Sequence, residues 1–295
     1  MDVQIIVNPI AGRGRAPQRQ AELEHALARA GHRGVPFPTA RAGDARRHAA
    51  RAAEFGAVAI IGGDGTVHEV LNGLDLAKAP PLLPVAMGTA NVLAKELGLP
   101  RDAERLARLI DTGRPRRLDI GTVERPGGPP QRFLLMAGIG FDAFVVDVIH
   151  SVRTGPIRMR HYMERGVRAL VRHRSPRMRL SVDGRLCASA ATFVQVANVR
   201  AYGGPLLLSM RARPDDGLLD VMWFTGPTKL DTLRLFAMAF VRNPAALPDV
   251  HWARGRRVTV EAEEPPPLQL DGDPGGTVTG PFAIVPAAVR ILVPS

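Results

Sequence analysis

A glycine-rich stretch with one carboxylate, GGDGT at residues 62–66, has the residue types and spacing to bind a phosphate. The β-branched run at 57–61 predicts a buried strand before it, and apolar residues at helical spacing over 67–74 follow. Such a strand, turn and helix aims main-chain N–H groups and the positive end of a helix at one point. Glycines let a phosphate approach the main chain, and Asp64, expected in a solvent-facing turn, can hold magnesium or meet a hydroxyl. A plain tight turn accounts for the glycines equally well.

Two further loops follow predicted strands and offer similar chemistry. NPIAGRG at 8–14 follows a strand at 3–7, and GTAN at 88–91 follows a strand at 82–87. The first is not a Walker A loop, because no Gly-Lys-Ser/Thr sequence ends it. Loops after parallel strands meet at one edge of a sheet, where ligands bind in open α/β folds. The glycine-rich loops together therefore predict a nucleotide-binding cleft.

The elements that must position these loops change character along the chain. Strand and helix patterns alternate up to about residue 116, which is typical of a parallel sheet covered by helices on both faces. After Pro176, short strand-like runs separated by turn residues dominate, with one clear helix at 230–241. The sequence predicts an α/β N-terminal domain with a parallel sheet and a C-terminal antiparallel β-sandwich domain, with the boundary near residue 118.

The composition restricts the class of protein and its partners. A chain of 295 residues with 45% hydrophobic residues can bury a sizeable core. No apolar run reaches the roughly 18 residues that span a bilayer, and the first residues lack the pattern of a secretory signal. Cys187 is the only cysteine, which excludes an internal disulfide and fits a reducing cytoplasm. The formal net charge of +11 favours anionic partners, such as a nucleotide, a nucleic acid or an acidic membrane surface.

The most basic stretch covers residues 151–179, where nine arginines accompany one acidic residue, Glu164. A basic amphipathic segment suits an anionic membrane surface, although a solvated helical face in an arginine-rich protein has the same pattern. Nucleic acid is disfavoured as a partner, because only 5% of residues are aromatic and the sequence contains no nucleic-acid-binding motif.

Taken together, the motifs resemble those of the diacylglycerol kinase catalytic family, which includes diacylglycerol, sphingosine and ceramide kinases. They follow the family's order along nearly the whole chain: NPIAGRG (8–14), GGDGTVHEVLNGL (62–74), GTANVLAKELGLP (88–100), LDIG (118–121), AGIGFDA (137–143), NVRAYGG (198–204), PDDGLLDV (214–221) and LDGD (270–273). GGDGT alone also occurs in NAD kinases, whereas the combination is specific. Two positions depart from the family pattern. Val92 stands where an acid commonly follows the asparagine of GTAN, and Asp273 stands where the last motif usually has glutamate.

The resemblance implies how the domains divide and which residues contact ATP and magnesium. The nucleotide-binding domain would cover 1–118 with the returning segment 286–295, and a lipid-binding β-sandwich would cover 119–285, with ATP in the cleft. A structural magnesium ion would bind at the DDGLLDV turn, held by the carboxylate of Asp216 and the main-chain carbonyls of Arg213 and Leu218. The implied ATP contacts are Asn8, Pro9, Ile10, Ala11, Gly12, Thr39, Gly63, Asp64, Gly65, Thr66, Val67, His68, Glu69 and Thr89.

The implied reaction is ATP-dependent phosphorylation of a hydroxyl on a lipid such as diacylglycerol or a sphingoid or ceramide lipid. Asp64 and Asp119 would lie near the magnesium that accompanies ATP, and either Asp273 or Asp271 would take the hydroxyl proton. In an extended chain, residues two apart point the same way. Both carboxylates would then approach the cleft unless Gly272 turns the chain.

These inferences predict a cytoplasmic enzyme that docks on the inner face of the membrane to reach its lipid. Residues 141–149 are a candidate wall of the groove for the acyl chains, and a homodimer is a further expectation. Two other functions stay open. A NAD-kinase-like enzyme with a soluble substrate would share GGDGT but not the later motifs. A lipid or nucleotide sensor that has lost the chemistry would fit the departures at Val92 and Asp273.

Overall fold

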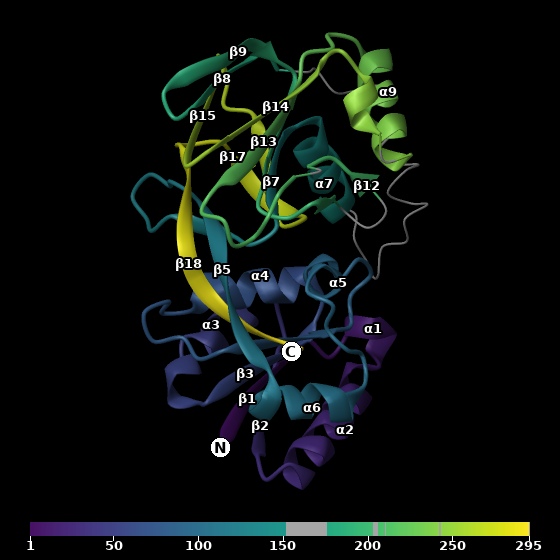
Figure 1. Ribbon diagram of the computed structural model, residues 1–295, viewed down its shortest axis with the longest axis vertical. Coiled ribbons are helices and arrows are strands. Elements are labelled where there is room, and N and C mark those ends of the chain that lie inside the picture. Colours follow the sequence, from purple (N-terminus) through teal and green to yellow (C-terminus); the bar gives the residue numbers. More distant parts are fainter. Residues whose placement is uncertain (152–175, 203–205, 210, 242, 295) are drawn as a thin grey trace. The chain divides into compact units, whose positions relative to one another are not determined.

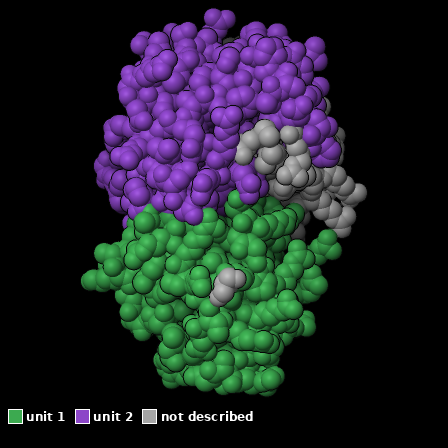
Figure 2. All heavy atoms as spheres, viewed as in Figure 1, with its two compact units in different colours: residues 1–118, 287–295 green, residues 119–286 purple. Residues whose placement is uncertain are grey.

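The computed structural model describes residues 1–151, 176–202, 206–209, 211–241 and 243–294. It divides into two compact units, shown in Figure 2: unit 1 is residues 1–118 and 287–295, and unit 2 is residues 119–286. The chain passes between the units twice, within strand β5 (Arg114–Val123) and within strand β18 (Phe282–Val293). The basic stretch predicted to dock on a membrane lies almost entirely outside the described residues.

Unit 1 is built on a parallel sheet with the strand order β2–β1–β3–β4, and the last part of β18 pairs with β4. Every residue of β3 is buried, which is usual for a parallel strand with helices on both faces. The prediction of an α/β domain with a parallel sheet is therefore confirmed. The remaining strands of this sheet are β1 (Asp2–Val7), β2 (Arg33–Pro38), β3 (Ala57–Gly62) and β4 (Leu82–Ala86).

Helices cover both faces of the unit 1 sheet (Figure 1). Residues of α2 and α6 share one apolar core with alternate residues of the strands, such as Ile5 and Ile61. Gln4 points to the other face, where its side-chain amide donates a hydrogen bond of 2.8 Å to the His48 carbonyl in α3. The helical elements of unit 1 are α1 (Ala11–Gly14), α2 (Ala16–Arg29), α3 (Asp44–Ala49), the 3-10 turn η1 (Ala52–Glu54), α4 (Asp64–Gly73), α5 (Val92–Glu96) and α6 (Ala103–Thr112).

Unit 2 consists of antiparallel strands around one apolar core, which confirms the predicted class of the second domain. One sheet has the order β14–β13–β10–β7–β16–β17. Strand β9 pairs with β8, β8 pairs with β15, and β15 pairs with the first part of β18. Strand β5 pairs with β6. Core side chains come from both groups of strands, for example Ile139 and Val196 from the first and Leu180 and Phe282 from the second.

The AGIGFDA motif spans a strand and a helix of unit 2, because β7 ends at Gly140 and α7 begins at Phe141. Among the described residues, no helix is long and apolar enough to cross a membrane. The remaining elements are β6 (Gln131–Phe133), β7 (Met136–Gly140), α7 (Phe141–Ser151), β8 (Met178–Val182), β9 (Arg185–Ala191), β10 (Phe193–Ala197), β11 (Ala201–Tyr202), β12 (Leu206–Leu207), β13 (Leu219–Phe224), α9 (Lys229–Phe240), the 3-10 turn η2 (Pro244–Ala246), β14 (Val250–Gly255), β15 (Arg257–Glu261), β16 (Pro267–Leu270) and β17 (Asp273–Thr277).

The glycine that ends the LDIG motif has a packing role. Gly121 lies opposite Phe133 in the β5–β6 pair, and a Cβ atom at Gly121 would overlap the ring of that fully buried phenylalanine. We expect Gly121→Ala to lower the free energy of unfolding by about 1–3 kcal/mol, the usual effect of overpacking a core. Denaturant unfolding measures this change. Gly128→Ala is the matched control, because a Cβ atom there meets nothing within 4 Å. Equal stability of the two variants would contradict the packing role.

Candidate functional site

Three glycine-containing loops meet at one edge of the unit 1 sheet. They follow β1, β3 and β4, which are parallel neighbours and therefore end at the same edge. A Cβ atom built on Gly88 would lie 2.6 Å from the Cα of Gly63, and one on Gly63 would lie 3.0 Å from the Cα of Gly88. The loops after β3 and β4 thus touch main chain to main chain, and a larger residue at either position would push them apart.

Asp64 joins the same two loops. Its carboxylate accepts hydrogen bonds from the N–H groups of Val92 (3.0 Å) and Leu93 (3.3 Å), the first residues of α5. Because these donors have no partner within their own helix, the carboxylate caps α5. The sequence predicted a solvent-facing turn, but Asp64 is half-buried in this contact. Val92, which replaces the acid usual in the family, is itself buried.

The loop after β1 contacts both of the others. The side-chain amide of Asn8 lies 3.4 Å from the hydroxyl of Thr66, to which it donates a hydrogen bond. Gly12 has a left-handed φ of 60°, and a Cβ atom there would strike the side chain of Met87 just after β4. Within the third loop, the side chain of Asn91 accepts from the Gly88 N–H (2.7 Å) and donates to the Gly88 carbonyl (2.8 Å). The motif asparagines therefore hold the loops in shape.

Three of the predicted ATP contacts make hydrogen bonds of their own within unit 1. Glu69 accepts a hydrogen bond of 3.0 Å from the N–H of Gly43, which precedes α3, so its carboxylate supports the loop after β2. His68 is buried on α4, and its ring lies 3.4 Å from the side-chain amide of Asn72. Thr39 extends β2, since its N–H donates to the Val7 carbonyl at 2.8 Å. The structure thus brings Asn8, Gly63, Asp64 and Thr66 together. The side chains of Glu69 and His68 contact Gly43 and Asn72.

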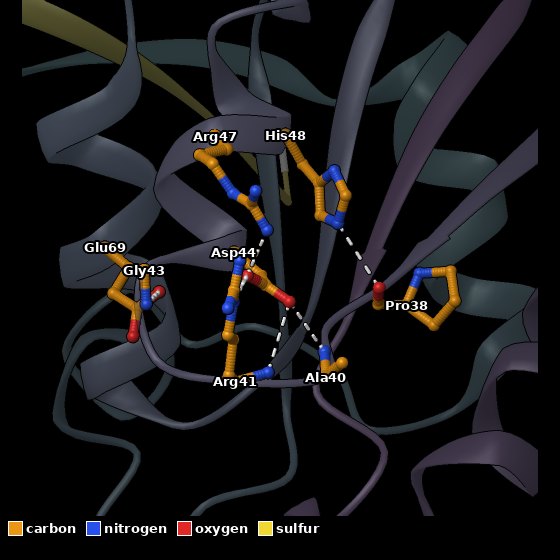
Figure 3. A network of polar contacts seen from close by, with 8 residues as sticks. All are labelled: Pro38, Ala40, Arg41, Gly43, Asp44, Arg47, His48 and Glu69. Atoms are coloured by element: carbon orange, nitrogen blue, oxygen red, sulfur yellow. Dashed lines mark hydrogen bonds and ion pairs between the residues drawn. The ribbon is translucent and has the colours of Figure 1, made fainter.

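Asp44, which the sequence reasoning did not single out, organises the loop after β2 (Figure 3). Its carboxylate accepts from the N–H groups of Ala40 (2.9 Å) and Arg41 (3.1 Å) and pairs with Arg47. These contacts lower the pKa of Asp44 from 3.8 to about 2, and the hydrogen bond from Ala40 has the largest effect. Burial of the carboxylate acts in the opposite direction. The sequence signal that could have identified Asp44 is an acid directly after Gly43, at the start of a helical pattern.

In unit 2, the two aspartates proposed as the base do not point the same way. Asp271 and Gly272 both have left-handed φ values, 54° and 88°, and Leu270 pairs with Asp273 across them. This is a two-residue hairpin turn of the kind that Asp-Gly favours. Gly272 therefore does turn the chain, and the two carboxylates have separate environments.

Asp271 is buried and fully engaged with the main chain. Its carboxylate accepts hydrogen bonds from the N–H groups of Leu134 (2.9 Å), Leu135 (2.8 Å) and Met136 (3.0 Å). Its own N–H donates to the Met136 carbonyl at 2.9 Å. Asp273 is the half-buried first residue of β17. Asp271 thus holds the segment that leads into β7, and Asp273 is the more accessible of the two.

A second pair of polar side chains, missed in the sequence, supports the same turn. The side-chain oxygen of Gln269 accepts from the Gly272 N–H (2.8 Å), and its amide donates to the carboxylate of Asp142 (2.9 Å). Both side chains are buried. A Cβ atom on Gly138 would overlap Asp142, so the glycine of AGIG makes room for this contact. The turn that carries Asp273 is therefore fixed from both sides.

The DDGLLDV turn is organised by charge contacts within the chain. Buried Asp119 accepts a hydrogen bond of 2.7 Å from the Gly217 N–H, so it lies beneath this turn. Asp216 accepts from the Leu218 N–H at 3.2 Å and pairs with the guanidinium of Arg254. Arg254 also contacts Asp220 at 3.2 Å; burial raises the pKa of Asp220, and the arginine opposes that rise.

These contacts decide how well the turn suits a magnesium ion. Both oxygens of Asp216 already have donors, one of them a cation that would repel a metal. No cluster of three or more acidic, histidine or cysteine side chains with metal-binding geometry occurs in the part of the chain that the structure describes. An ion held by the carboxylate of Asp216 would have to displace Arg254, and the structural magnesium implied by the resemblance stays a prediction.

Comparisons with known proteins agree across both units. The model for the diacylglycerol kinase catalytic domain matches residues 2–123, and the model for the YegS C-terminal NAD kinase beta sandwich-like domain matches residues 136–293. A diacylglycerol kinase of Mycobacterium tuberculosis is 33% identical over 99% of this chain and 95% of its own length.

Solved structures show the same fold. A diacylglycerol kinase from Bacillus anthracis superposes with a TM-score of 0.75 at 22% identity, covering 99% of this chain and 97% of that one. An NAD kinase from Archaeoglobus fulgidus in complex with ATP has a TM-score of 0.55 at 15% identity, covering 99% and 92%. The resemblance seen in the motifs is thereby confirmed.

The two candidate bases should differ in stability. Asp271→Asn places an amide against three main-chain donors, and we expect it to lower the free energy of unfolding by about 2–3 kcal/mol. Asp273→Asn, at a half-exposed position, should cost less than about 1 kcal/mol. Thermal and denaturant unfolding of both variants measures the difference. A stable Asp271→Asn protein would contradict the buried clamp.

The turn around Asp216 should be insensitive to chelation. We expect the wild-type melting temperature to be the same in EDTA and in excess magnesium. Arg254→Ala leaves Asp216 and Asp220 without their cation, so it should melt lower and regain stability with magnesium. Arg234→Ala, which removes an exposed ion pair with Asp249, is the control. A wild-type protein that loses stability in EDTA would instead restore the metal ion at this turn.

Proposed function

Since this chain belongs to the diacylglycerol kinase catalytic family, we propose that it transfers the γ-phosphoryl group of ATP to a hydroxyl of a membrane lipid, diacylglycerol or a sphingoid or ceramide lipid. The observation that carries the proposal is the meeting of three glycine loops at the carboxyl edge of β1, β3 and β4. At this edge a phosphate can approach the main chain closely, and the start of α4 lies at the same place. A triphosphate requires both features.

The triphosphate would lie against the loops after β1, β3 and β4. Main-chain N–H groups at the start of a helix attract phosphate oxygens, and α4 begins directly after Gly63. Gly63 and Gly88 leave no side chain in the way, and the hydroxyl of Thr66 is held by Asn8. Asp64 keeps the two glycine loops together through α5. Magnesium bound with ATP would neutralise charge on the phosphates, with Asp64 as the carboxylate nearest to these loops.

We assign the role of general base to Asp273. The lipid hydroxyl oxygen forms the new bond to the γ-phosphorus, the bond from that phosphorus to the β–γ bridging oxygen breaks, and the hydroxyl proton passes to the carboxylate of Asp273. Asp271 is engaged by three N–H donors, so it serves as a positioning residue. Gln269 and Asp142 hold the other side of the turn.

Family membership separates this proposal from its rivals. The relative from Mycobacterium tuberculosis is named a diacylglycerol kinase, and it matches over almost the whole chain. An NAD-kinase-like activity has the fold in its favour, because the ATP-bound NAD kinase shares it. A sensor without catalysis is favoured by Val92 and by the shorter side chain of Asp273. The substrate panel below distinguishes all three.

The test is transfer of radiolabelled phosphate from ATP to diacylglycerol, sphingosine, ceramide and NAD, each offered separately. We expect label in a lipid and none in NAD. Label in NAD alone would establish the soluble-substrate rival, and ATP binding without any transfer would establish the sensor.

The assignment of the base predicts a specific set of variants. Asp273→Asn should reduce turnover by about 10²–10⁴ with little change in ATP affinity, because the amide keeps the shape but takes no proton. Asp273→Glu should stay active, since it restores the side chain usual in the family. Glu263→Gln, an exposed acid of unit 2, is the control. If a folded Asp271→Asn protein loses more turnover than Asp273→Asn, the two roles are exchanged.

A further inference from the structure

Helix α9, labelled in Figure 1, carries large apolar side chains that are exposed to solvent. Leu230 is 73% exposed, Leu233 46%, Phe240 51% and Val241, just past the helix, 63%. Spacings of three and seven residues place these side chains on one face of a helix. Most large apolar side chains among the described residues are buried, so three exposed ones on one short helix and a fourth directly after it form a patch rather than scattered exceptions.

The opposite face fixes the helix on unit 2. Leu235 and Ala239 are fully buried, and the ring of Phe236 lies edge-on to Phe141 (5.5 Å between centroids) and Phe193 (6.0 Å). At the start of the helix, Thr228 and Asp231 form a capping box. The orientation of α9 is therefore set by packing and capping, and the exposed row is the outer face of an anchored helix.

The charges around this row suit an anionic surface. Lys229 and Arg234 are exposed on α9, and Arg234 also pairs with Asp249 at 3.3 Å. The acid of the helix, Asp231, is engaged in the capping box. Apolar residues flanked by lysine and arginine are typical of helices that lie in the interface of an anionic bilayer. A net charge of +11 on the whole chain acts in the same direction.

We propose that the outer face of α9, formed by Leu230, Leu233, Phe240 and Val241, inserts into the interfacial region of an anionic lipid bilayer and docks unit 2 there. The inference rests on the proposed function for its purpose, because a lipid substrate has to be reached at a bilayer. Docking itself needs neither ATP nor turnover.

The test is co-sedimentation of the full chain with phosphatidylglycerol–phosphatidylcholine vesicles without ATP. The double variant Leu233→Ser/Phe240→Ser should bind about tenfold or more weakly, because two large side chains no longer leave water. Leu186→Ser is the matched control, since Leu186 on β9 is 49% exposed and should leave binding unchanged. Unaltered melting temperatures would show that both variants fold.

A second measurement follows insertion directly. Phe240→Trp should keep vesicle binding, and its added fluorescence should shift to the blue and be quenched by lipids brominated on their acyl chains. Absence of quenching would overturn the proposal, as would wild-type vesicle binding by the double variant. Wild-type dimers that the double variant converts to monomers, with vesicle binding unaffected, would identify α9 as a subunit interface and overturn it too.

Activity separates this inference from the function on which it rests. With detergent-dispersed short-chain lipid, the double variant should phosphorylate at the wild-type rate, whereas with vesicles it should lose about as much activity as binding. A wild-type protein that phosphorylates no lipid but binds vesicles through α9 would refute the proposed function and support the docking surface. Equal loss of activity in detergent and in vesicles would refute the docking role of α9.

Discussion

The close approach of Gly63 and Gly88 is the constraint on which the first unit depends. Neighbouring parallel strands lie just under 5 Å apart, and the loops that follow them normally diverge because side chains separate them. Here both loops carry glycine at the point of contact, and the Asp64 carboxylate ties the beginning of α5 to the beginning of α4. One side chain therefore fixes two helix starts against each other. The edge of the sheet becomes a single surface of main-chain groups rather than three independent loops.

The second unit uses a carboxylate in a comparable way. Asp271 ties a hairpin turn to a segment more than 130 residues earlier in the sequence through three N–H donors. In both units, a motif aspartate that looks catalytic in the sequence is engaged with the main chain. The adjacent acid at the second site, Asp273, is thereby left half-exposed on a rigid turn. This division of roles explains why the motif has two acids: one shapes the turn and the other faces outward.

Local sequence patterns made much of this fold predictable, whereas contacts between residues far apart in the sequence could not be predicted. The buried run of β3, the glycines after it and the helical spacing of α4 are adjacent in sequence, so the strand, turn and helix could be inferred directly. The Asp-Gly pair at 271–272 was also a local hairpin signal, and the structure decides between the extended chain and the turn at Gly272 that the sequence left open. The main-chain partners of Asp271 lie 135–137 residues away in the sequence, Gln269 lies 127 residues from Asp142, and Arg254 lies 38 residues from Asp216. No local sequence pattern predicts contacts over such separations. Arg254 is the clearest example, because nothing near it in the sequence marks it as a counter-ion of the DDGLLDV turn.

The return of β18 to unit 1 affects how the protein is made. Ile291 pairs with Leu82 on β4, and Val289, Ile291 and Leu292 are buried there. During synthesis, the first 118 residues emerge from the ribosome long before this strand exists. The open side of β4 then remains an unpaired edge in a nascent chain while the whole of unit 2 is translated. Unit 1 can complete its sheet only once β18 has been translated, which follows the synthesis of the whole of unit 2.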